Sequence, residues 1–236
     1  MISSPDASPQ IIHDPRERTK LIIDDLRALL KSPSAPRETV WTSAFLSTLA
    51  IGPDDPYPKE DQDYLALLLE ERELLLSLAR KGCTVKCIIS PANKNYIRHA
   101  GIDYAIKRTS RLIDFISGQD PALDHIQWAI SELGTKNLYI LGHLSCFEGY
   151  KKGIHQGYGL TLRQTSRDVI SANIDLHSRF FSDLAARTLT QWGEKRDIQT
   201  SQSDLIRIAA IRCLRVSLQF LAEFSQGMHG DVQSNP

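Results

Sequence analysis

The chain has 236 residues, 42% of them hydrophobic, so it can bury one sizeable core or two small ones. Lysine and arginine together number 28, as do aspartate and glutamate, and the formal net charge is zero. A balanced charge exerts no overall attraction on nucleic acid or an anionic membrane, so we expect no general nucleic-acid binding. No apolar run is long enough to cross a bilayer, and we expect no membrane association.

The cysteines stand singly in apolar stretches, without the spacing of a disulfide scaffold or a zinc site. We therefore expect reduced, buried thiols, no bound metal and no cofactor; the cysteines are Cys83, Cys87, Cys146 and Cys213. The first residues have no charged segment followed by an apolar one, so we expect a cytoplasmic protein.

The first half of the chain predicts alternating helix and strand. Residues 1–15 are polar and without periodicity, and we expect a flexible N-terminal arm. Apolar residues at helical spacing predict a helix over residues 15–31, and a β-branched and aromatic run predicts a strand over 39–46. A longer helix over 63–81 ends at Gly82, and a second strand follows over 84–89. This order predicts a parallel crossover between the two strands.

The second half predicts a change of pattern. Helices are expected up to Gly118 and over 121–133, followed by a third strand over 137–141. Residues 144–151 and 158–164 are two short β-like segments, and the glycine-rich residues 152–157 separate them. This arrangement predicts an antiparallel hairpin. A helix over 167–192, a final helix within 204–226 and a flexible tail over 227–236 complete the chain. The predicted fold class is α/β, with one domain over 16–192: a mixed, mainly parallel sheet flanked by helices, with a late β-hairpin and a C-terminal helix.

Common catalytic signatures are missing from the sequence. It contains no G-x-x-x-x-G-K-[ST] phosphate loop, no G-x-S-x-G nucleophile elbow and no H-E-x-x-H zinc motif. No motif therefore names a reaction.

The order of several elements, and their amino-acid sequences, resemble those of the phospholipase D-like superfamily over roughly residues 18–190. The resemblance rests on a first strand, a helix that ends in glycine before a second strand, and a hairpin ahead of a long helix. The segments that carry it are Val40-Trp41-Thr42-Ser43-Ala44-Phe45 and Gly82-Cys83-Thr84-Val85-Lys86-Cys87-Ile88-Ile89-Ser90-Pro91. It implies the fold of that superfamily and, because single-copy members often pair their halves, a homodimer.

The catalytic motif of that superfamily, H-x-K-x4-D, is absent from this chain. In active members the histidine attacks phosphorus and the lysine holds phosphate oxygens. The strand that would carry the motif falls near His143, where Ser145 replaces the lysine. The resemblance therefore implies a catalytically inactive pseudoenzyme.

His143 is nevertheless the most interesting histidine. It ends the third predicted strand, where open α/β sheets place their ligands. His143 with Glu148, or His143 activating Cys146, could form an acid/base or nucleophilic pair. Alternatively, His143 caps a strand and Cys146 belongs to the core. The other strand ends add Ser43, Ser90, Asn93 and Lys94 to the same predicted edge, where they could form a small polar pocket.

Two clusters of basic residues occur. Lys151 and Lys152 on the hairpin, with Arg163 beyond it, could bind a nucleotide or another phosphate-bearing ligand, or they could be a solvated hairpin. The second cluster, residues 107, 108 and 111, follows helical spacing, and we interpret it as a solvent-exposed face.

The final helix is apolar over more than half its circumference. Packing on the domain is one explanation, and a homodimer interface is the other.

Three functions remain open from the sequence. The first is a catalytically inactive phospholipase D-like module that acts as a binding, sensor or scaffold protein, for instance for a phosphate-containing ligand. The second is a hydrolase or nuclease that acts on a nucleotide or phosphoester through a non-standard site around His143 and Glu148. The third is an interaction protein that works through its final helix.

Overall fold

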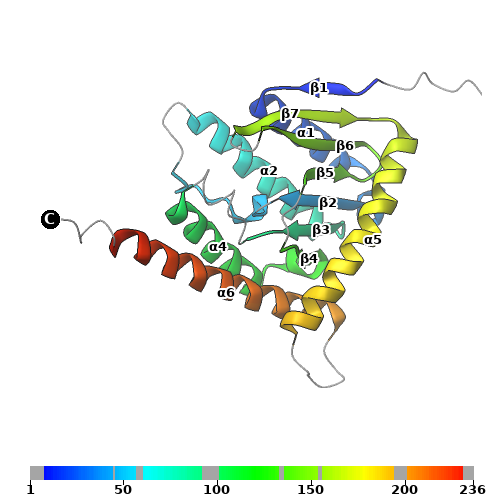
Figure 1. The fold of residues 1–236 in the computed structure, drawn as a ribbon. Coiled ribbons are helices and arrows are strands. Elements are labelled where there is room, and N and C mark those ends of the chain that lie inside the picture. The colour runs from blue at the N-terminus through cyan, green and yellow to red at the C-terminus, as the bar shows by residue number, and fades with distance from the viewer. Residues whose placement is uncertain are drawn as a thin grey trace, which may run out of the picture.

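The computed structural model describes residues 8–44, 46–56, 61–91, 101–132, 136–153, 156–193 and 201–230. Residues 151–153, 156–158 and 227–230 are described by their backbone alone. The described residues fold into a single sheet with helices on both of its faces (Figure 1).

The sheet has seven strands in the order β1-β7-β6-β5-β2-β3-β4. The strands are β1 (Gln10–Ile12), β2 (Thr39–Ala44), β3 (Thr84–Ile89), β4 (Ile126–Ile130), β5 (Asn137–Leu141), β6 (Ser145–Gly153) and β7 (Gln156–Gln164). The strands β2, β3 and β4 pair in parallel, whereas β5, β6, β7 and β1 are added by antiparallel pairings. The mixed α/β class, the late hairpin and the C-terminal helix are therefore confirmed. The parallel part is smaller than expected, because β5 runs opposite to β2.

Helices cover the two faces of the sheet unequally. One face packs against α1 (Pro15–Lys31), α2 (Gln62–Arg80) and α4 (Ile102–Ser117), through a core that includes Val40 and Val85. The other face packs against α5 (Arg167–Trp192), where Trp41 and Ile140 meet helix side chains. Adjacent residues of β2 thus serve opposite faces, as the period of a strand requires.

The caps of two helices follow from the sequence. Pro15 occupies the first turn of α1, and the Asp14 carboxylate accepts a hydrogen bond from the Arg16 amide at 2.9 Å. At the end of α2, Gly82 has a φ of 95°, a left-handed conformation that favours glycine. The Cys83 amide then donates to the Leu78 carbonyl, which closes the helix end.

The predicted helix over residues 121–133 is wrong. Pro121–His125 forms a short 3-10 turn, η4, and β4 follows directly. Trp128 packs into the core beneath α4, whereas Ala129 belongs to the core beneath α5, so β4 is buried on both sides. The sequence favoured a helix because Leu123, Ile126 and Ile130 stand at i, i+3 and i+7, the spacing of one helix face, and β4 is only five residues long. The predicted arm is also partly ordered, because β1 pairs with β7.

The C-terminal helix α6 (Gln202–Gly230) packs against α4, α5 and β4 (Figure 1). Ala210 and Leu214 are fully buried in that contact. Farther along, Val216, Phe220 and Phe224 are exposed, and the rings of the two phenylalanines stack. Within the described ranges, no helix combines the length and hydropathy needed to span a membrane.

Candidate functional site

A pocket of about 160 Å³ lies at the carboxyl end of β2. Thr42 and Ser43 come from the end of the strand, and Ser47 and Thr48 from the turn that leads into η2 (Thr48–Ala50). The parallel neighbour β3 lies on one side of β2 and the antiparallel β5 on the other, so the strand order changes direction here. Open α/β sheets place their ligands at such a point.

Glu71 of α2 lies in the wall of this pocket and is 1% exposed. Its Oε1 accepts a hydrogen bond from the Tyr139 hydroxyl at 2.9 Å and another from the Thr48 hydroxyl at 2.8 Å. Its Oε2 is buried and has no hydrogen-bond partner among the described residues. A buried carboxyl oxygen without a partner is costly to the fold, which marks this atom as a functional candidate.

Burial raises the pKa of Glu71 above its ordinary value. The positive charges of Arg18 and Arg108 and the two hydrogen bonds act in the opposite direction, but burial has the larger effect. Because both hydrogen bonds go to Oε1, the proton of the neutral acid belongs on Oε2. Neutral Glu71 is then a hydrogen-bond donor at the pocket.

Two arginines complete the polar part of the pocket. Arg18 of α1 donates to the Asn137 Oδ1 atom at 2.9 Å, and its guanidinium carbon lies 6.0 Å from the centre of the Tyr139 ring. Arg108 of α4 is buried and donates to the Ser47 carbonyl at 2.8 Å. The prediction that residues 107, 108 and 111 form a solvent-exposed face is therefore wrong for Arg108.

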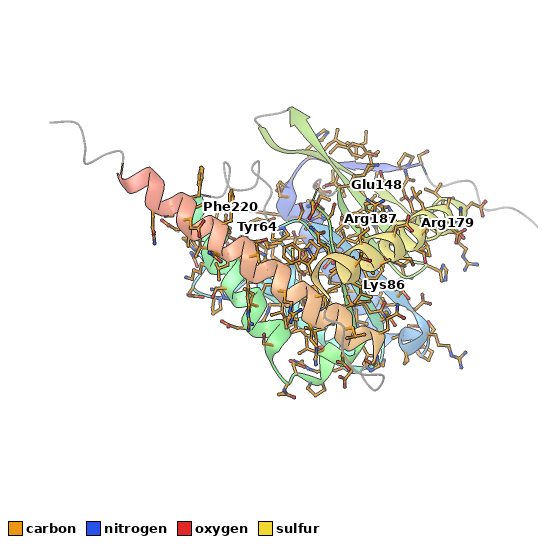
Figure 2. The ribbon with its side chains drawn as sticks, turned by 60° about the horizontal axis from the view of Figure 1, so that its bottom comes forward. Tyr64, Lys86, Glu148, Arg179, Arg187 and Phe220 are labelled. Carbon is orange, nitrogen blue, oxygen red and sulfur yellow. The ribbon has the colours of Figure 1, made fainter. Side chains whose placement is uncertain are left out.

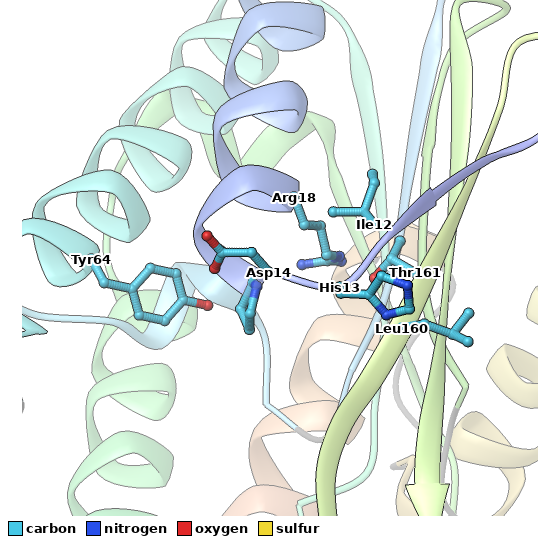
Figure 3. Close-up of a pocket in the computed structure, with 8 residues that line it drawn as sticks. Ile12, His13, Asp14, Arg18, Tyr64, Leu160 and Thr161 are labelled. Atoms are coloured by element: carbon cyan, nitrogen blue, oxygen red, sulfur yellow. The ribbon is translucent and has the colours of Figure 1, made fainter.

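A smaller hollow of about 20 Å³ adjoins the pocket, since Arg18 and Tyr64 line both. Figure 3 shows Arg18 of α1 next to His13 and Thr161, with Tyr64 of α2 on the other side. The pocket therefore continues from the end of β2 toward the start of α1.

The structure separates His143 from the strand ends with which it was expected to cluster. Ser43 pairs with Leu138, at the start of β5, whereas His143 follows the end of β5. Because β5 runs antiparallel to β2, the end of β5 lies next to the start of β2. His143 is therefore at the opposite ends of the strands from Ser43, and it is exposed. Strand direction is set by tertiary pairing and not by the local sequence, so the residue pattern gave no warning.

Glu148 lies away from both His143 and the pocket. It pairs with Leu138 on the face covered by α5, and the Tyr150 hydroxyl donates to its Oε2 at 2.5 Å. No hydrogen bond or ion pair joins it to His143 in the described part of the chain. Cys146 is fully buried, and burial raises the pKa of its thiol to about 12, which disfavours a nucleophilic thiolate.

The predicted ligand-binding residues are dispersed. Ser43 lines the pocket, and Ser90 is buried just past the end of β3. Arg163 of β7 forms an ion pair with Asp25 of α1, with 2.9 Å to each carboxylate oxygen. Asn93 and Lys94, and the side chains of Lys151 and Lys152, lie outside what the structure describes.

Four pocket residues were missed by sequence reasoning: Arg18, Glu71, Arg108 and Tyr139. Glu71 carried a usable signal, because it shares a helix stripe with Leu68 and Leu75, both buried. A charge placed inside an apolar stripe indicates a buried polar site. In the described ranges, no group of three or more His, Cys, Asp and Glu side chains could hold a metal ion.

Comparisons with known proteins identify no family. No protein-family model matches the chain, and no curated protein matches it. Among solved structures, the archaeal chromatin protein TrmBL2, described as showing a novel mode of DNA binding, matches with a TM-score of 0.43 and 10% identity. The match covers 77% of this chain and 55% of the TrmBL2 chain.

The match to a DNA-binding protein contradicts the expectation of no general nucleic-acid binding. That expectation rested on net charge alone, and a sum of zero says nothing about how charges are distributed over a surface. We therefore withdraw it. A likeness at this TM-score carries no argument for any function of this chain.

Proposed function

We propose that the chain is a binding or sensor module that holds a small anion, such as a phosphate-bearing compound, in the pocket at the end of β2. The observation that carries the proposal is that Arg18 and Arg108 line the same pocket as Glu71, whose Oε2 is buried and unpaired among the described residues. This interpretation agrees with the resemblance to a phospholipase D-like pseudoenzyme. The four buried free cysteines support a reducing, cytoplasmic location.

The charge of the pocket favours an anion. Two guanidinium groups and one carboxyl group line the 160 Å³ pocket itself, so these charges sum to a positive value whether or not Glu71 is ionised, and one further acid, Asp14, lines the adjoining hollow. If Glu71 is neutral, as its raised pKa favours, Oε2–H adds a donor where an ionised carboxylate would repel the ligand. A negatively charged ligand would give that atom the partner it lacks.

The polar groups at the strand end suit a phosphate or carboxylate. Ser43 adds a hydroxyl to the same pocket, and arginine presents several N–H donors in a planar fork. The volume is below the roughly 300 Å³ at which drug-sized pockets begin, so the ligand is small.

Binding explains the site better than catalysis does. In the described part of the chain, no histidine lines the pocket at the end of β2, and His13 lines only the adjoining hollow. Cys87, the thiol beside Thr42 and Ser47, has its pKa raised to about 11 by burial. Anion binding requires neither a nucleophile nor a base, whereas phosphoester hydrolysis requires at least one of them.

Calorimetry with orthophosphate, sulfate and malonate at pH 6 tests the proposal. We expect at least one anion to bind, and Arg18→Gln to weaken that binding about tenfold, or about 1.4 kcal/mol. Arg179→Gln is the matched control, because Arg179 is exposed on α5 beyond the opposite face of the sheet (Figure 2). Absence of binding to all three anions, or equal weakening by both variants, would overturn the proposal.

A further inference from the structure

A second pocket, of about 240 Å³, lies on the opposite face of the sheet, between α5 and the first turn of α6. Its walls include the apolar side chains of Phe181, Ala185 and Ile206. Gln127 of β4 and Ser182 of α5 contribute polar atoms. This pocket shares no lining residue with the pocket at the end of β2.

Lys86 of β3 provides the charge of this second pocket. It lies beside Trp41 in the parallel register of β2 and β3, and its ammonium is 4.4 Å from the centre of the Trp41 ring and 5.2 Å from that of Phe181. The two rings meet edge to face at 5.8 Å. Lys86 is thus held in one place by two aromatic side chains.

The Lys86 ammonium has no hydrogen-bond acceptor and no carboxylate partner among the described residues. Burial alone lowers its pKa, and no neighbouring acid acts in the opposite direction. The side chain is partly exposed and lines the pocket, so its three N–H donors are available to a bound molecule. An ammonium fixed this way attracts an anion into the hollow.

The walls indicate which anion fits. A lysine is a point charge, without the fork by which arginine grips phosphate, so one carboxylate satisfies it. The apolar side chains opposite favour an apolar body on the same molecule, because burying that body contributes to affinity.

We propose that this pocket binds a small organic carboxylate with an apolar body, its carboxylate on the Lys86 ammonium and its body against Phe181 and Ile206. This site is independent of the one at the end of β2. It gives a function to a lysine that is otherwise placed without an acidic partner.

A purely structural role for Lys86 makes a different prediction. If the lysine serves only to stack on Trp41 and Phe181, Lys86→Met should lower the melting temperature of the free protein. If the lysine is kept for a ligand, removing a half-buried charge should leave the melting temperature unchanged or raise it, while ligand binding is lost.

Benzoate is the probe. Two control compounds are used beside it: acetate, which lacks the apolar ring, and benzyl alcohol, which lacks the charge. We expect benzoate to raise the melting temperature and to slow acylation of Lys86 about tenfold, as measured by peptide mass spectrometry, and acetate and benzyl alcohol to do much less. Lys20 on the exposed side of α1 is the internal control, since its acylation should not change. Arg18→Gln should leave the benzoate effect intact, and Lys86→Arg should retain part of it.

Three results would overturn the proposal. The first is that benzoate changes neither the melting temperature nor the acylation of Lys86. The second is that Lys86→Met binds benzoate as tightly as the unmodified chain, or lowers the melting temperature in the manner of a structural residue. The third is that orthophosphate protects Lys86 and benzoate does not, which would make the ligand class wrong.

Discussion

Burying a carboxyl group without a full set of partners links its protonation to folding. The pKa of Glu71 is raised in the folded chain by burial, so the native state holds a proton that the unfolded chain has already released. The contribution of Glu71 to the free energy of unfolding is therefore fully present below the pKa that Glu71 has in the unfolded chain. That contribution is lost as the pH rises through the pKa that Glu71 has in the folded chain.

Glu71→Gln should remove this dependence. Between the ordinary glutamate value near 4.5 and the raised folded value, the free energy of unfolding of the unmodified chain should fall with pH, at up to about 1.4 kcal/mol per unit for one proton. The glutamine variant should lack that contribution and retain the donor at the pocket. Urea unfolding from pH 4 to 8 measures the difference between the two chains. Parallel curves for both chains would show that Glu71 does not titrate differently on folding.

Sequence reasoning misjudged single residues wherever a charge is buried. The sequence favoured a solvent-exposed face for Arg108 and gave no role to Glu71, because charged side chains are seldom buried. Both are satisfied by partners distant in the chain, namely the Ser47 carbonyl and the Tyr139 hydroxyl. No local pattern reveals such a partner, so the pocket at the end of β2 became visible only in the fold.

Among the elements, α6 combines a buried face with an exposed apolar one. Leu214 is fully buried in the main core, whereas Phe220, six residues later, is 46% exposed (Figure 2). Leu221, the next residue, is again fully buried, so α6 is attached to the domain along one face, and Phe220 lies on the other face.

Matched truncations of α6 should separate the two faces. Leu214→Ala should lower the free energy of unfolding by about 2–5 kcal/mol, because it leaves a cavity. Phe220→Ala should change it by less than about 1 kcal/mol, since Phe220 is already 46% exposed and its ring stacks on another exposed ring, that of Phe224. Chemical denaturation of both variants measures this. A large loss for Phe220→Ala would mean that its side chain is covered in solution.

Elements were predicted well where they are long and periodic, and poorly where they are short. The amphipathic helices α1 and α2 and the hairpin of β6 and β7 were found from their periodicity and from the turn residues between them. β4 has only five residues, and the apolar residues in and before it also fit helical spacing. The reversed direction of β5 could not be predicted, because a strand has the same side-chain period in either direction.

At the scale of the whole molecule, the sheet separates two pockets with different chemistry. The pocket at the end of β2 holds two arginines and a buried acid, and the pocket beneath α5 holds one lysine and aromatic rings. Since no lining residue is shared, we expect the two to bind independently.

Ligand stabilisation should therefore be additive. With each ligand at about 100 times its dissociation constant, each alone should add about 2.7 kcal/mol to the free energy of unfolding, and orthophosphate with benzoate should add about twice that. Denaturant unfolding with neither, either or both ligands gives the four values required. If the two single-ligand increases in the free energy of unfolding, added together, differ by more than about 0.5 kcal/mol from the increase with both ligands, the pockets are coupled through the sheet.

The two outer strands of the sheet bear on how the protein behaves in concentrated solution. An unpaired strand edge can recruit a strand from another molecule. At one border β1 has only three residues, and at the other α5 and α6 pack against β4. There the Ile130 amide, which points away from β3, donates at 3.1 Å to the hydroxyl of Thr188 on α5. A helix side chain thus takes the place that an incoming strand would need, which protects this border against growth into aggregates.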